Sequence, residues 1–99
     1  MHLENTIQRY KSMATYLLET TLAQQGWDGF GEYEDGINIW GKKVNGNYTE
    51  LLVGPLEVEG VVNNLHLIQF SFDEEGNPVK ADAPTPKTEQ ELKQLGCLN

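Results

Sequence analysis

Two dipeptides, Asp35-Gly36 and Asn45-Gly46, constrain the fold of this 99-residue chain more than any other feature of its sequence. Each lies between short apolar runs, and both favour the positive backbone angles of two-residue hairpin turns. We therefore expect residues 30–72 to form an antiparallel meander sheet.

The runs between turn signals give the expected strands, which cover residues 30–34, 37–44, 48–53, 56–62 and 65–72. Gly54-Pro55 is expected to bend or break the ribbon, because proline cannot donate a ladder hydrogen bond. Asn63-Asn64 is a weaker hairpin signal, so the last two runs form either two strands or one. Residues 73–87 follow as a loop rich in proline and alanine.

The N-terminal segment has the periodicity of an amphipathic α-helix over residues 3–25. Its apolar residues recur mainly three and four positions apart: Leu3, Ile7, Tyr10, Ala14, Leu17, Leu18 and Leu22. Gly26 is suited to end this helix in the left-handed conformation, after which Trp27 folds back against it. A second, short helix is predicted over residues 88–95, since Thr88 and Glu91 have the spacing of a capping box.

Together these elements predict one α+β domain over residues 1–99. An N-terminal amphipathic helix packs on a four- to five-stranded antiparallel meander sheet, and a short C-terminal helix follows. The single long helix covers only one face of the sheet.

The strand expected over residues 65–72 is apolar on both faces, as in a strand buried on both sides. Leu65 and Leu67 lie on one face and Ile68 on the other. One explanation is that the C-terminal helix covers the leucines through Leu92 and Leu95. The other is that a second copy of the chain covers them in a homodimer.

Negative charge is concentrated in the sheet region. Between Val44 and Val79 there is no lysine or arginine, and the carboxylates there supply most of the formal net charge of -8: Glu50, Glu57, Glu59, Asp73, Glu74 and Glu75. Because side chains alternate along a strand, Glu57 and Glu59 are expected to share one face, and so are Glu32 and Glu34. We therefore expect rows of carboxylates on an exposed face.

The strand over residues 37–44 adds an aromatic side chain to this surface. We expect Ile37 and Ile39 to face the helix, which turns Trp40 outward. The candidate partner-binding residues are then the acidic rows, the exposed tryptophan and the acidic run that follows the sheet: Glu32, Glu34, Trp40, Glu57, Glu59, Asp73, Glu74 and Glu75.

An acidic surface of this kind suits a basic partner protein, since complementary charge raises association rates and disfavours wrong partners. Residues two apart on a strand lie about 6.6–6.8 Å apart, comparable to the phosphate repeat of a nucleic-acid strand, so a nucleic-acid-binding enzyme is a natural target. We interpret the chain as a non-enzymatic interaction protein of the inhibitor, immunity or phage anti-defence type.

Two other interpretations stay open. The acidic residues are also of the number that merely keeps a small domain soluble. Alternatively, the chain is a small-molecule-binding or enzymatic domain with an aromatic pocket between helix and sheet, lined by Trp27, Phe30, Tyr33 and Tyr48.

No catalytic, metal or cofactor site is expected. His66 lies in an apolar strand and is interpreted as a packed strand residue rather than a general base. One cysteine and two distant histidines offer no transition-metal ligand pair. The run at residues 73–77 lacks the ligand spacing of a calcium loop and is interpreted as a solvated turn.

The charge balance also argues against direct binding to nucleic acid or to a membrane. Seven lysines and arginines are scattered among fifteen acidic residues, so no basic patch is expected. No stretch approaches the roughly 20 apolar residues of a membrane span. The single cysteine, Cys97, agrees with a reducing compartment, and we expect a cytoplasmic protein.

Overall fold

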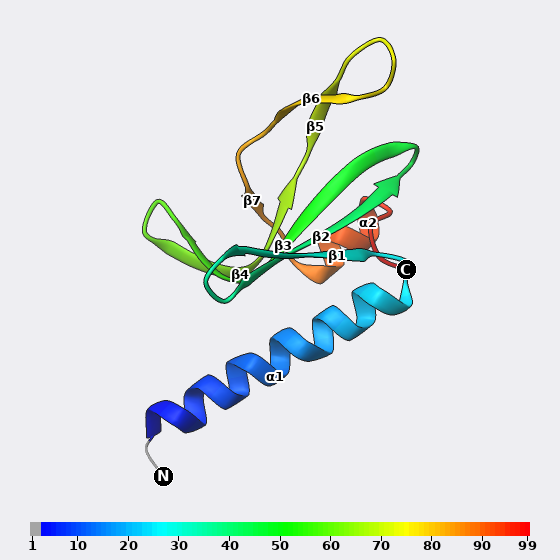
Figure 1. The fold of residues 1–99 in the computed structure, drawn as a ribbon. Helices are drawn as coiled ribbons and strands as arrows, with labels where there is room; N and C mark the ends of the chain where they lie inside the picture. The colour runs from blue at the N-terminus through cyan, green and yellow to red at the C-terminus, as the bar shows by residue number, and fades with distance from the viewer. Residues whose placement is uncertain (1–2) are drawn as a thin grey trace.

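The computed structural model describes the backbone of residues 3–99 and the side chains of residues 13–99. Helix α1 (Leu3–Gln24) precedes an antiparallel meander, and the short helix α2 (Glu89–Gln94) follows it. The strands are β1 (Asp28–Glu34), β2 (Ile37–Val44), β3 (Asn47–Val58), β4 (Val61–Ile68), β5 (Phe70–Phe72), β6 (Pro78–Ala81) and β7 (Thr85–Pro86). The predicted α+β fold with its antiparallel sheet is confirmed (Figure 1).

The strands form two sheets. Five strands pair in the order β1-β2-β3-β4-β7, while β5 and β6 pair as a separate hairpin. In Figure 1 this hairpin rises from the main sheet on the side away from α1. The predicted loop over residues 73–87 is therefore wrong in part, because it contains β6 and β7. The predicted strand over residues 65–72 divides at Gln69, between β4 and β5.

Two of the hairpin turns form where the sequence predicts them. Asn45 and Gly46 have φ angles of 52° and 85°, and Gly36 has a φ of 81°. The third turn lies at Glu59 and Gly60, with φ angles of 53° and 79°, and not at Asn63-Asn64. The predicted strand over residues 56–62 is therefore wrong, since its first half belongs to β3 and its second half to β4.

Strand β3 continues through Gly54-Pro55 instead of breaking there, and its register against β4 shifts at this point. Gly54 has a φ of 140°. A Cβ at Gly54 would clash with the carbonyl oxygen of Gly36 and would lie 2.9 Å from the Cα of Ile37. The β1–β2 turn is thus packed directly on the backbone of β3, which only glycine permits.

The sheet is buried on both faces. On one face it packs with α1 and α2 around a core of Leu22, Trp27, Leu51, Val53, Leu65, Leu67, Leu92, Cys97 and Leu98. On the other face a smaller cluster contains Ile37, Leu52, Leu56 and Ile68. Alternation along β3 therefore sends Leu51 and Val53 to one core and Leu52 to the other.

Helix α2 accounts for the burial of Leu65 and Leu67, because Leu92 packs in the same core. Leu95, in contrast, stays exposed. The capping box of α2 is present as predicted, with Glu91 N–H donating to Thr88 Oγ1 at 3.1 Å. One chain is thus enough to bury both leucines, and a homodimer stays a prediction.

Helix α1 meets the sheet through Leu18 and Leu22. Leu17, which the periodicity places on the same apolar stripe, is exposed instead. The side chains of Leu3, Ile7 and Tyr10 lie outside the described residues.

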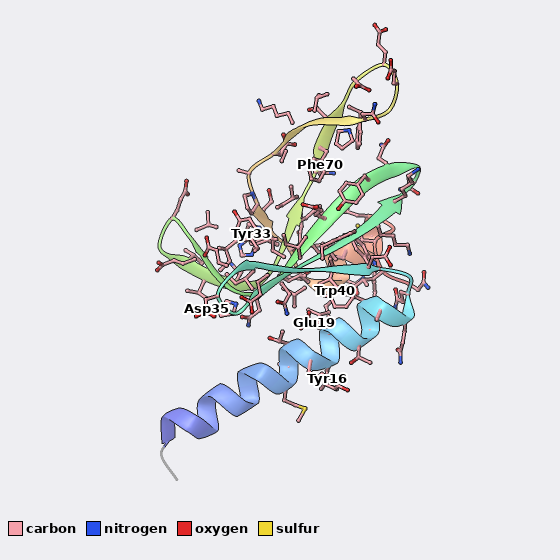
Figure 2. All side chains as sticks on the ribbon, viewed as in Figure 1. Tyr16, Glu19, Tyr33, Asp35, Trp40 and Phe70 are labelled. Atoms are coloured by element: carbon pink, nitrogen blue, oxygen red, sulfur yellow. The ribbon has the colours of Figure 1, made fainter. Side chains whose placement is uncertain are left out.

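The orientation of β2 is the reverse of the prediction. Trp40 packs against the core beneath α1, whereas Ile37 and Ile39 lie in the cluster on the far face. The Trp40 indole N–H donates to Glu19 Oε2 at 2.6 Å, and Asn38 Nδ2 donates to both oxygens of Glu19 at 3.0 and 3.2 Å. Figure 2 shows Glu19 of α1 next to Trp40 of the sheet. Both faces of β2 carry apolar side chains, but the face that meets the helix also carries Asn38, Trp40 and Lys42, whose donors bond to Glu19 and Gln25.

We expect Gly54→Ala to lower the free energy of unfolding by about 3 kcal/mol or more, because a Cβ there collides with the backbone of the β1–β2 turn. Gly60→Ala is the matched control. Gly60 also has a positive φ, but a Cβ there meets nothing within 4 Å, so its cost should be only about 1 kcal/mol. Urea denaturation followed by tryptophan fluorescence measures both, and equal losses would contradict this packing.

Candidate interaction surface

The predicted partner-binding residues do not share one face. Glu32 and Glu34 lie on β1, Glu57 and Glu59 near the β3–β4 turn, and residues 73–75 at the tip of the β5–β6 hairpin. Figure 1 shows that this last hairpin projects away from the other two groups. Trp40 is not part of any exposed surface patch, because it lies beneath α1.

The two glutamates of β1 do not form a row. Glu32 pairs with Asn38, whose side chain faces α1, while Glu34 pairs with Ile37, whose side chain faces the opposite side. A register shift between the two glutamates separates them. Such a bulge reverses the expected alternation, and a single sequence does not reveal it. Every residue of β1 is nevertheless exposed.

Glu57 and Glu59 do not form a row either. Glu57 is paired with Val62 within the strands, whereas Glu59 occupies the turn. Val61 and Val62 are 60% and 56% exposed. The β3–β4 tip therefore presents two carboxylates beside two exposed valines.

The β1–β2 turn and the β3–β4 tip lie at the same end of the sheet. The backbone of Gly36 packs on Gly54, three residues before Glu57, and Figure 1 shows the two turns at one end. We call this region the acidic end, and it comprises Glu32, Glu34, Asp35, Glu57 and Glu59.

The carboxylates of the acidic end have no cationic partner within residues 13–99. The one salt bridge there joins Lys87 Nζ to Glu91 Oε2 at 3.9 Å. Lys42 instead donates to the carbonyl oxygen of Gln25 at 2.7 Å. The negative charge of the acidic end is thus not neutralised by the side chains that the structure describes.

The run at residues 73–77 forms a solvated turn, as the sequence predicts. Asp73 Oδ1 accepts hydrogen bonds from the backbone N–H groups of Glu75 at 3.0 Å and Asn77 at 2.8 Å. Gly76 has a positive φ of 86°. The Asp73 carboxylate is therefore engaged in holding the turn.

The aromatic pocket expected between helix and sheet does not form. Trp27 is buried in the core, where its indole N–H donates to the carbonyl oxygen of Cys97 at 3.0 Å. Phe30 and Tyr48 meet above Gly41 on the face of the sheet away from α1. Tyr33 is exposed. The four rings therefore do not surround one cavity.

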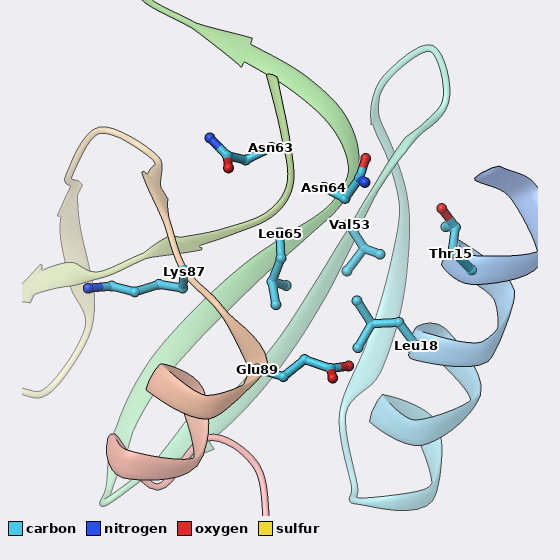
Figure 3. Close-up of a pocket in the computed structure, with 9 residues that line it drawn as sticks. Thr15, Leu18, Val53, Asn63, Asn64, Leu65, Lys87 and Glu89 are labelled. Atoms are coloured by element: carbon cyan, nitrogen blue, oxygen red, sulfur yellow. The ribbon is translucent and has the colours of Figure 1, made fainter. Parts of the chain in front are cut away.

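A different cavity of about 310 Å³ lies where α1 meets the sheet and the start of α2 (Figure 3). It is lined by Ala14, Thr15, Leu18, Val53, Asn63, Asn64, Leu65, Lys87 and Glu89. Figure 3 shows three aliphatic side chains at its centre and Lys87 extending away from it. Its lining thus combines aliphatic side chains with polar ones, among them the ionisable Lys87 and Glu89.

His66 is buried, as predicted, in β4. It pairs with Leu52 of β3 and Pro86 of β7, and neither ring nitrogen has a hydrogen-bond partner among the described residues. Burial lowers the pKa of His66 below its ordinary value of 6.5, so the ring is neutral near neutral pH. A buried side chain of this kind cannot reach a substrate.

The described residues contain no group of three His, Cys, Asp or Glu side chains placed to hold a metal ion. Nor is any helix among them long and apolar enough to cross a membrane.

No protein-family model matches this chain, and no curated protein or solved structure is significantly similar to it.

We expect stability to depend on His66 at acidic pH. Because the folded state lowers the pKa of this ring, the unfolded state takes up the proton first, so stability is full above about pH 6.5 and falls below it. Between pH 6.5 and pH 5.5 the loss is at most about 1.4 kcal/mol, because one titrating group changes the stability by no more than this per pH unit. Urea denaturation of the wild type and His66→Leu at both pH values measures the difference. An equal loss in the variant would contradict this assignment.

Proposed function

We propose that this protein is a non-enzymatic binding protein that occupies and blocks a positively charged surface of another protein. The observation that carries the proposal is the acidic end, where two hairpins that carry carboxylates lie at the same end of the sheet, with no salt bridge to these carboxylates among the described side chains. A cytoplasmic location, consistent with the single cysteine, belongs to the same proposal.

Charge at the acidic end favours association with a cation-rich surface for two reasons. Like charges held at one end of a sheet repel each other, and a basic partner relieves that repulsion. The same field steers a basic partner during diffusion, which raises the association rate and makes it sensitive to salt.

Exposed apolar side chains supply a second requirement of a binding site. Val61 and Val62 lie between the carboxylates of the β3–β4 tip and the rest of β4. Interfaces commonly combine a desolvated apolar centre with a polar rim. The acidic end has both within one hairpin.

A nucleic-acid-binding enzyme fits this proposal as a target, because such enzymes present the basic surfaces that the acidic end complements. The regular carboxylate rows that would resemble a phosphate backbone are absent, since a bulge separates Glu32 from Glu34 and Glu59 lies in a turn. The proposal therefore depends on complementary charge and not on imitation of phosphate spacing.

A pair of charge-reversed variants tests this proposal. Glu57→Lys with Glu59→Lys changes the acidic end, whereas Glu74→Lys with Glu75→Lys makes the same change in net charge on the β5–β6 hairpin. We expect immobilised wild-type protein to capture a basic protein from a cell extract at about 50 mM salt and to release that protein near 500 mM salt. The partner is then identified and purified for affinity measurements.

For the purified partner, we expect the first double variant to weaken binding at least about tenfold and the second less than about twofold. Duplex DNA should compete with this protein for the partner if the blocked surface of the partner binds nucleic acid. Equal weakening by both variants would show that only overall charge matters. Failure to capture any basic protein at low salt would remove the basis for the proposal.

A further inference from the structure

The face of the sheet away from the helices carries three aromatic rings beside a carboxylate. The ring centroids of Tyr48 and Phe70 lie 5.4 Å apart with an interplanar angle of 44°. The Tyr48 hydroxyl donates to Glu50 Oε2 at 2.6 Å. Figure 2 shows Phe70 on the side of the main sheet opposite α1.

Phe30 joins this group because Gly41 has no side chain. A Cβ on Gly41 would lie 2.5 Å from Phe30 Cε2 and 2.6 Å from the Tyr48 hydroxyl oxygen. Both side chains therefore reach the same point above Gly41, and Glu50 is the direct cross-strand partner of Gly41. Phe30, Tyr48, Phe70 and Glu50, which we call the aromatic cluster, thus converge over one glycine.

The cluster is accessible from solvent. Phe30 is 58% exposed, and the other three side chains are partly buried. Aromatic rings in a closed core are shielded from solvent, whereas the Phe30 ring, on the edge strand β1, is exposed. A ligand can therefore approach both the rings and the carboxylate.

The chemistry of the cluster suits a cation. The faces of aromatic rings attract ammonium and guanidinium groups. A carboxylate accepts several hydrogen bonds, so Glu50 keeps acceptor capacity beyond its bond from Tyr48. Burial and the neighbouring Glu50 raise the pKa of Tyr48, so its hydroxyl stays protonated and donates to Glu50.

Among the described residues no cation fills this position. Lys43 lies opposite Tyr48 in the neighbouring strand, but it makes no salt bridge with Glu50.

We propose that the aromatic cluster binds an arginine side chain of the basic partner. A planar guanidinium stacks on aromatic faces and also donates in parallel to a carboxylate, which an ammonium group does less well. That the arginine belongs to a partner protein rests on the proposed function, whereas the affinity of the cluster for a guanidinium does not. Phe30 of the cluster lies on β1, as do Glu32 and Glu34 of the acidic end, so one partner surface can contact both.

NMR titration of the full chain with N-acetyl-arginine amide tests this site directly, and the citrulline analogue is the control ligand because it has nearly the same shape without the charge. We expect binding at millimolar concentration, with the largest shifts on the rings of Phe30, Tyr48 and Phe70. The citrulline analogue should bind at least about threefold more weakly.

Variants assign the binding to the cluster. Phe30→Leu should weaken arginine binding about two- to fivefold by removing one exposed ring. Glu50→Gln keeps an acceptor for Tyr48 but removes the charge, and should weaken arginine binding by a similar factor. Tyr33→Leu removes an exposed ring of the same strand outside the cluster and should have no effect. Gly41→Ala retains all four residues of the cluster but displaces the Phe30 and Tyr48 side chains, so it should also weaken binding.

Equal binding of the two ligands, or shifts confined to the acidic end, would overturn the proposal. If Phe30→Leu fails to fold, as judged by its amide spectrum, the affinity of the Glu50→Gln variant for N-acetyl-arginine amide still tests the proposal. Arginine binding without capture of any basic protein would contradict the proposed function while supporting the cluster as a cation site.

Discussion

The hydrogen bonds from Trp40 and Asn38 to Glu19 determine how the sheet is oriented against α1. Strand β2 carries apolar side chains on both faces, so hydrophobic burial alone does not select one orientation. The indole N–H, once buried, requires an acceptor, and Glu19 is placed to provide it. With Trp40 facing the helix, cross-strand pairing fixes the orientation of β3 and β4 as well. Gly41 and Glu50 are thereby turned to the opposite face, where the aromatic cluster forms.

Local rules predicted much of the fold. The Asn45-Gly46 turn, the end of α1 near Gly26 and the capping box at Thr88 each depend on a few adjacent residues, and each is present. The predictions that were wrong concern positions whose conformation depends on residues far away in the sequence. Gly54-Pro55 interrupts a strand by its own propensity, but the packing of Gly36 on Gly54 keeps β3 continuous.

The candidate site was harder to predict than the fold. The bulges of β1 reverse the alternation that placed Glu32 and Glu34 together, and the turn at Glu59 removes a second expected row. One part of the aromatic cluster, in contrast, is indicated by the sequence. A two-residue turn at Asn45-Gly46 fixes the register in which Gly41 lies opposite Glu50, so the sequence alone indicates that this carboxylate lies beside a residue without a side chain.

Nuclear Overhauser contacts in the unmodified protein report directly on the orientation of β2 against α1. We expect contacts from the Trp40 indole N–H to the side-chain protons of Glu19, together with contacts from the α-protons of Gly41 to the rings of Phe30 and Tyr48. Contacts from Ile39 methyl groups to Glu19, with a solvent-exposed Trp40 indole, would contradict the account.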